Sequence, residues 1–87
     1  EGMTEYTIAL SSVTTAARAK ELLRQSGIDA RITRLLPGMT EKGCAWGVSF
    51  FAAMEREQIE MLLRRGRVRY SEVFSTQMKR HGGERGR

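Results

Sequence analysis

The sequence of 87 residues predicts one α+β domain in which four strands and two helices follow the order βαββαβ. Three observations predict this order. Four short segments alternate apolar and polar residues, as half-buried strands do. Two longer segments repeat apolar residues at helical spacing. A glycine follows each helical segment, at the position where helices commonly end.

The first half of the chain supplies a strand, a helix and a second strand. Residues 5–11, EYTIALS, alternate, and residues 12–27 follow with helical spacing between Ser12, which can cap the start, and Gly27, which can adopt the left-handed conformation at the end. Residues 28–33, IDARIT, alternate again. The side chains predicted to face the core are Tyr6, Ile8, Leu10, Val13, Ala16, Ala19, Leu23, Ile28, Ala30 and Ile32.

The second half repeats the pattern after a break at Pro37-Gly38, where residues 36–43 are predicted to form a loop. Residues 45–51, AWGVSFF, form the third predicted strand, residues 54–66 the second helix, and residues 67–75, RVRYSEVFS, the fourth strand. Met61 falls between charged positions on the helical wheel and is expected to be exposed. The predicted inward side chains are Trp46, Val48, Phe50, Ile59, Leu62, Leu63, Val68 and Tyr70.

Two βαβ units in succession interleave into one four-stranded antiparallel sheet, because each crossover returns right-handed to the same sheet. The expected architecture is therefore the ferredoxin-like sandwich, with both helices on one face and the first and third strands in the centre. The domain is expected to span residues 4–76. Residues 77–87 are expected to be a disordered basic tail, and residues 1–2 resemble an expression remnant before Met3.

The composition limits the chemistry. One cysteine cannot form an internal disulfide, and one histidine with one cysteine cannot build a zinc site, so neither a metal nor a cofactor is expected. A free cysteine fits a reducing, cytoplasmic setting, and no apolar run is long enough to span a membrane. The net charge of +5 is uneven, because residues 67–87 hold six basic and two acidic groups.

Nucleic-acid binding is disfavoured by the predicted outer face of the sheet. RNA-recognition sheets stack bases on aromatic side chains of the central strands. Here the aromatic residues Tyr6, Trp46 and Phe50 have the parity of the helix-facing side. Arg31, Arg67 and Arg69 reach the outer face on edge strands, where they can either bind an anion or simply keep the two edges soluble. The outer face of the central strands is predicted to show Thr7, Ala9, Ala45, Gly47 and Ser49.

Cys44 is the candidate functional residue. It stands at a junction of loop and strand, Gly43 lets the backbone turn so that N–H groups can point at a thiolate, and Lys42 adds a positive charge. No fixed general base accompanies it, since His81 lies in the expected tail, so hydrolysis is a poor fit. The competing interpretation is a small buried side chain, because free cysteine is often buried.

The chain resembles the selenium/sulfur carrier protein-like family, a small domain of unknown function with a single loop cysteine. The resemblance runs from Tyr6 to about Phe74. It rests on Ser12, on the pattern AxxAxxLLxxxGI from Ala16 to Ile28, on Pro37 seven residues before Cys44, and on Gly43-Cys44 followed by a small-residue strand. Ala45 stands where the family usually has glycine, and residues 40–42 replace a serine-rich stretch.

The resemblance implies a carrier rather than an enzyme. Such a protein would hold a persulfide or selenopersulfide on Cys44, with Lys42, Gly43, Ala45 and Gly47 in support. A cysteine desulfurase-like donor would transfer the sulfur or selenium to Cys44, and an unknown acceptor protein would take it from there. The chain could also form a homodimer. Two alternatives remain: a non-catalytic regulatory or assembly module of the same fold, and a weak, salt-sensitive nucleic-acid binder that uses the basic last strand and tail.

Overall fold

The computed structural model describes residues 3–36, 43 and 45–75, and it contains the predicted elements in the predicted order. The expected remnant at residues 1–2 and the expected tail at 77–87 lie outside the described residues, as do Lys42 and Cys44. The elements are β1 (Thr4–Leu10), α1 (Val13–Gln25), β2 (Ala30–Arg34), β3 (Trp46–Ala52), α2 (Arg56–Arg65) and β4 (Glu72–Ser75).

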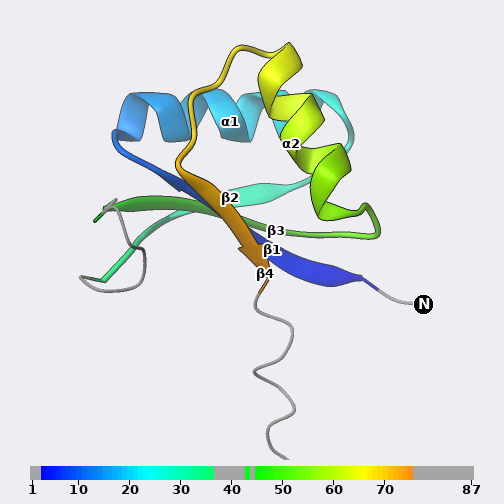
Figure 1. The fold of residues 1–87 in the computed structure, drawn as a ribbon, viewed down its shortest axis with the longest axis horizontal. Helices are drawn as coiled ribbons and strands as arrows, with labels where there is room; N and C mark the ends of the chain where they lie inside the picture. The colour runs from blue at the N-terminus through cyan, green and yellow to red at the C-terminus, as the bar shows by residue number, and fades with distance from the viewer. Residues whose placement is uncertain (1–2, 37–42, 44, 76–87) are drawn as a thin grey trace, which may run out of the picture.

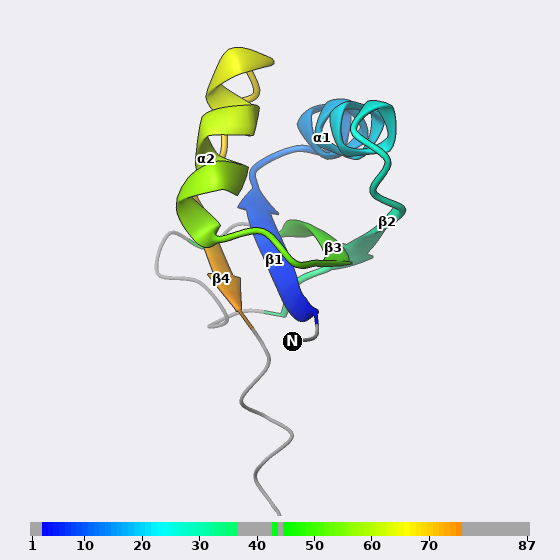
Figure 2. The ribbon, with the colours of Figure 1, turned by 90° about the vertical axis from the view of Figure 1, so that its right-hand side faces the viewer.

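The four strands form one antiparallel sheet in the order β2-β3-β1-β4. The prediction that the first and third strands lie in the centre is confirmed. Figures 1 and 2 show both helices on the same side of this sheet, as in the ferredoxin-like sandwich. The register pairs Ile8 with Val48 and Tyr6 with Phe50, so the helix-facing side chains of the central strands are neighbours.

The core fills the layer between helices and sheet. Leu23 of α1 and Ile59 and Leu63 of α2 are fully buried there. The Tyr6 hydroxyl, on the same side of β1, donates a hydrogen bond of 2.7 Å to the Met54 carbonyl, which satisfies the one polar atom of that side chain. The other fully buried core side chains are Ile8, Leu10, Ala16, Ala19, Val48 and Phe50, whereas Ile28, Ile32, Trp46, Leu62 and Tyr70 are partly buried against them.

Val13 does not belong to this core, contrary to the sequence prediction. Its side chain is 47% exposed, because it is the first residue of α1 and the helix reaches the sheet only from Ala16 onward. The start of the helix itself is as predicted: the Ser12 hydroxyl accepts a hydrogen bond of 3.2 Å from the Thr15 N–H. The exposure predicted for Met61 is also confirmed, at 55%.

Both helices end in the same pair of hydrogen bonds. At the end of α1 the Ile28 N–H bonds the Leu23 carbonyl, and Gly27 has a positive φ of 86°. At the end of α2 the Val68 N–H bonds the Leu63 carbonyl in the same way, but the residue with positive φ, at 59°, is Arg67. This arrangement is the Schellman motif.

The last strand is shorter than predicted. Residues 67–71 precede β4, because the N–H groups of Arg67 and Val68 are used by the end of α2 rather than by the sheet. Val68 is buried and Tyr70 is partly buried against the core, as predicted. Alternate residues therefore point inward here without forming a strand, and this is why the sequence pattern is misleading.

The sheet face opposite the helices is partly covered. Leu35, just after β2, and Phe74 of β4 pack against Ala9, which is fully buried. The hydroxyls of Thr7 and Ser49 form a buried hydrogen bond of 3.0 Å across the two central strands. The outer face is therefore closed along its centre, rather than open as the sequence predicted. Within the described residues, no helix is long and apolar enough to cross a membrane.

Candidate functional site

The predicted site residues that the structure describes are Gly43, Ala45 and Gly47. Lys42 and Cys44 lie outside the described residues. Gly43 is exposed and has a φ of 71°, a left-handed conformation that glycine adopts without a steric penalty. The supporting role predicted for Gly43 beside the cysteine stays a prediction.

Ala45, on the other side of the cysteine, is held by the end of β2. The Leu35 N–H donates a hydrogen bond of 2.8 Å to the Ala45 carbonyl. This bond continues the β2–β3 ladder beyond its last strand pair, Arg34 with Trp46. The chain neighbour that follows Cys44 thus belongs to the rigid sheet, while the neighbour that precedes it is exposed.

A cation–π contact lies at this end of the sheet. The Arg34 guanidinium lies over the Trp46 ring, 4.7 Å from the ring centroid. Trp46 is partly buried against the core, and Arg34 is exposed. Sequence reasoning missed Arg34, although its place as the last residue of a strand that precedes the cysteine loop was a usable signal.

Gly47 is closely packed by side chains of two other segments. A Cβ atom at this position would lie 2.9 Å from Leu35 Cδ2 and 3.2 Å from Thr7 Cγ2. Because real Cβ contacts are longer, a larger residue would displace Leu35, which also holds Ala45. The missing side chain of Gly47 lets Leu35 pack over the start of β3, whereas the supporting role predicted for Gly47 at the cysteine stays a prediction.

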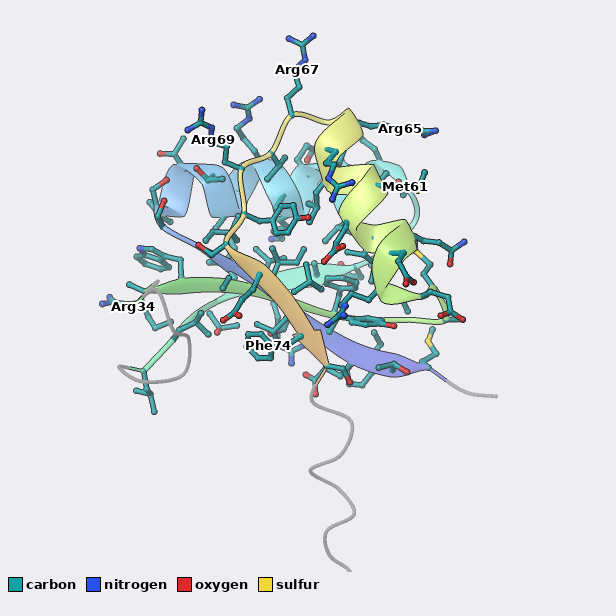
Figure 3. All side chains as sticks on the ribbon, in the orientation of Figure 1. Arg34, Met61, Arg65, Arg67, Arg69 and Phe74 are labelled. Carbon is teal, nitrogen blue, oxygen red and sulfur yellow. The ribbon has the colours of Figure 1, made fainter. Side chains whose placement is uncertain are left out.

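The outer face carries two phenylalanines that sequence reasoning overlooked. Phe51 directly follows Phe50 in β3 and so must point to the opposite side of the sheet; it is 51% exposed. Phe74 lies on the same face (Figure 3). Arg31 is on this face as predicted and forms an ion pair of 3.3 Å with Glu5.

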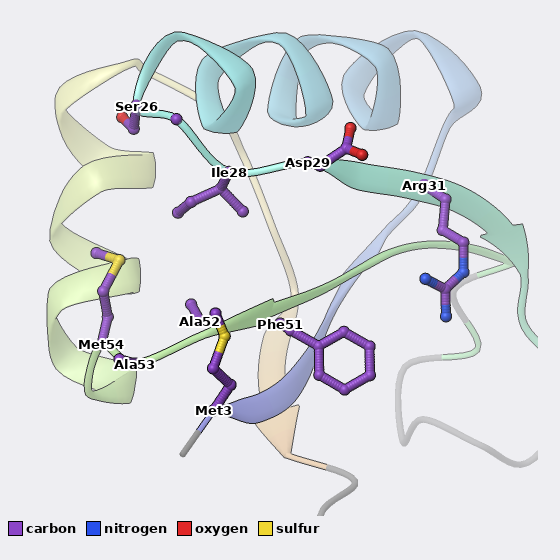
Figure 4. A pocket seen from close by; sticks show the side chains of 10 residues that line it. Met3, Ser26, Ile28, Asp29, Arg31, Phe51, Ala52, Ala53 and Met54 are labelled. Atoms are coloured by element: carbon purple, nitrogen blue, oxygen red, sulfur yellow. The ribbon is translucent and has the colours of Figure 1, made fainter. Parts of the chain in front are cut away.

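One hollow lies at the other end of β3 from Ala45. Its volume is about 660 Å³, and it is open to one side (Figure 4). Apolar side chains of Met3, Phe51 and Met54 line it together with Asp29 and Arg31. None of the described residues next to the cysteine contributes to it, so it belongs to a different surface. Within the described residues, no three histidine, cysteine or acidic side chains gather as metal ligands would.

Comparison with known protein families identifies one family. A model of the family described as "Putative Se/S carrier protein-like" matches residues 5–75, which is most of the chain and all of the sheet except the first residue of β1. No curated protein matches the chain. The family match agrees with the resemblance inferred from the helix pattern and from the spacing of the proline and the cysteine. The chain belongs to the Se/S carrier protein-like family.

Proposed function

We propose that the protein carries sulfur or selenium as a persulfide or selenopersulfide on Cys44 and passes it from a donor protein to an acceptor protein. The observation that carries this proposal is the family match over residues 5–75. The two described chain neighbours of the cysteine, Gly43 and Ala45, support it. Gly43, which precedes Cys44 in the chain, is exposed, and Ala45, which follows it, is hydrogen-bonded by Leu35.

The proposed transfer needs no oxidant. The Cys44 thiolate attacks the outer sulfur of a persulfide on the donor, a new S–S bond forms, and the old S–S bond breaks. The donor cysteine leaves as a thiolate, and Cys44 holds the outer sulfur. A second exchange of the same kind moves that sulfur to an acceptor thiol. The carrier therefore needs a reachable thiolate, which Lys42 is proposed to favour, but no general base.

The experiment is to incubate the protein with a cysteine desulfurase and cysteine, and then to measure its intact mass under non-reducing conditions. A mass increase of one sulfur atom that reducing agent removes is expected. Because Cys44 is the only cysteine, the increase has one possible cysteine site. The Cys44→Ser variant is the control and should stay unmodified.

A parallel arm measures alkylation of Cys44 in the native and the unfolded protein. Comparable rates are expected for an accessible thiol. A native thiol that resists both alkylation and sulfur loading would contradict the carrier function and would favour a packed thiol in an interaction domain.

A second candidate function, an assembly module, is favoured by the exposed side chains of Met3 and Phe51 beside the hollow in Figure 4. An apolar surface of this kind can be covered by another chain. Its test is the sedimentation of the protein over a range of concentrations, with Phe51→Ser as the variant. An oligomer that Phe51→Ser dissociates would support assembly, and a monomer at all concentrations would contradict it as self-assembly.

A further inference from the structure

Four arginines within six residues surround the end of α2. Two lie in the last helical turn and two lie in the connection to β4. All four are exposed, and Figure 3 shows the labelled members beyond the helices, on the side of the molecule away from the outer sheet face. We call this set the arginine cluster: Arg64, Arg65, Arg67 and Arg69.

The backbone at Arg67 is strained. Its φ of 59° lies in the left-handed region, which disfavours residues that have a Cβ atom. The equivalent residue after α1 is Gly27, with a φ of 86° and the same hydrogen bonds. Glycine would therefore suit position 67 better for folding. An arginine that occupies a strained position points to a role for its side chain.

The helix dipole does not account for the whole cluster. Cations in the last turn of a helix interact favourably with its C-terminal carbonyls, which explains Arg64 and Arg65. Arg67 and Arg69 lie beyond the helix. Between them Val68 is buried, so the backbone directs the two arginines on either side of it away from the core.

The guanidinium groups of the arginine cluster form no ion pair with a described carboxylate. Within the described part of the chain, no carboxylate lies within ion-pair distance of any of its members. The nearby acidic residue of α1, Glu21, is already held by Arg24 at 2.6 Å, and this hydrogen bond lowers the pKa of Glu21. A shallow hollow of about 190 Å³ lies beside the cluster, lined by Arg18, Glu21 and Val68 among others.

We propose that the arginine cluster is the docking surface for an acidic patch on a partner protein. Guanidinium groups recognise carboxylates in a fixed, two-pronged geometry, and here the Schellman motif and buried Val68 hold the backbone of the cluster rigidly. A single-stranded nucleic acid would also need aromatic side chains on which to stack bases. The neighbouring aromatic residue, Tyr70, is instead packed against the core.

The test measures binding of poly-L-glutamate to the full chain by fluorescence anisotropy at low and at physiological ionic strength. The cluster variant carries Arg65→Gln, Arg67→Gln and Arg69→Gln. We expect it to bind about tenfold more weakly, because each exposed pair contributes roughly a factor of two to three. The control carries Arg31→Gln, Arg34→Gln and Arg56→Gln, which removes three positive charges elsewhere, leaves the pair of Arg24 with Glu21 in place, and should weaken binding much less.

Arg67→Gly gives an independent readout. It should raise the melting temperature, since strain is relieved, and yet weaken poly-L-glutamate binding. Cys44→Ser should bind as the wild type does, so failure of this proposal is separable from failure of the carrier function. Equal losses in cluster and control variants would overturn the proposal. It would also be overturned by a short DNA duplex that binds the cluster more tightly than poly-L-glutamate at physiological ionic strength.

Discussion

Leu35 lies directly over Gly47, so close that a single added methyl group on Gly47 would come within 2.9 Å of it. The same residue donates its N–H to the Ala45 carbonyl. One leucine thus fixes two positions of the chain on the strand side of Cys44: it packs on one and hydrogen-bonds the other. The rigid side of the candidate site depends on this contact.

Gly47→Ala should lower the free energy of unfolding by about 1–3 kcal/mol, because the added methyl group must displace Leu35 and Thr7. Urea unfolding measures this loss. The double variant Gly47→Ala with Leu35→Ala removes one of the two contacts, so its loss should be smaller than the sum of the single losses. Strictly additive losses would show that the two residues do not press on each other.

Gly66→Ala should destabilise the protein through a steric contact between the two helices. A Cβ atom at Gly66 would lie 2.6 Å from Leu22 Cδ2, although the φ of −83° is ordinary for any residue. We expect a loss of about 1–3 kcal/mol in thermal or urea unfolding.

Gly27→Ala is the informative comparison for Gly66→Ala. It meets open space but has a positive φ, so its cost of about 1–2 kcal/mol comes from the backbone alone. Adding Leu22→Ala should reduce the cost of Gly66→Ala and leave that of Gly27→Ala unchanged. If Leu22→Ala changed both costs equally, the steric explanation would fail.

Leu23→Ala should cost about 2–5 kcal/mol of unfolding free energy, because it leaves a cavity in a core that is small to begin with. Leu23 is fully buried between α1 and the sheet. Met61→Ala on the other helix is the matched control, and it should change stability by less than about 0.5 kcal/mol, since its side chain lies mainly in solvent. Urea midpoints of the two variants give the comparison; similar midpoints would show that the core is placed wrongly.

Arg34→Ala should change the fluorescence of Trp46 and leave the fold intact. Trp46 is the only tryptophan, so the emission spectrum reports on this one cation–aromatic contact. The loss of stability should be about 0.5–1 kcal/mol, as for other exposed pairs of this kind. Arg34→Lys keeps the charge and should preserve more of the wild-type spectrum. An unchanged spectrum in Arg34→Ala would mean that the guanidinium does not rest on the ring in solution.

The architecture could be predicted because most segments signal their structure locally. Alternation in residues 5–11 and 45–51 gives both the strands and the side that each residue faces, and the spacing of Ala16, Ala19 and Leu23 gives the buried side of α1. Residues 67–71 were predicted wrongly because Val68 and Tyr70 alternate inward while the backbone completes a helix end. Alternation of apolar and polar residues indicates which side chains are buried, but it does not indicate whether the backbone hydrogen bonds belong to a sheet or to a helix end.

The candidate site was predictable only in part. Gly43 and Gly47 could be singled out, but the reason for Gly47 is its contact with Leu35, which comes from another strand and depends on the register. The sequence pattern predicts Arg67 and Arg69 on the outer sheet face because it assigns residues 67–71 to the fourth strand, which in the structure begins at Glu72. The structure places both before that strand, at the end of α2. Contacts of this kind follow from tertiary packing, which no local pattern encodes.

The central position of β1 also affects how the protein is made. Among the strands of this sheet β1 is synthesised first, yet one of its two edges is completed by β4, which is synthesised last. Until residues 72–75 emerge, that edge presents unpaired backbone groups to any other extended chain. The nascent domain therefore stays open to wrong pairings for nearly its whole synthesis, and it closes only when its final strand arrives.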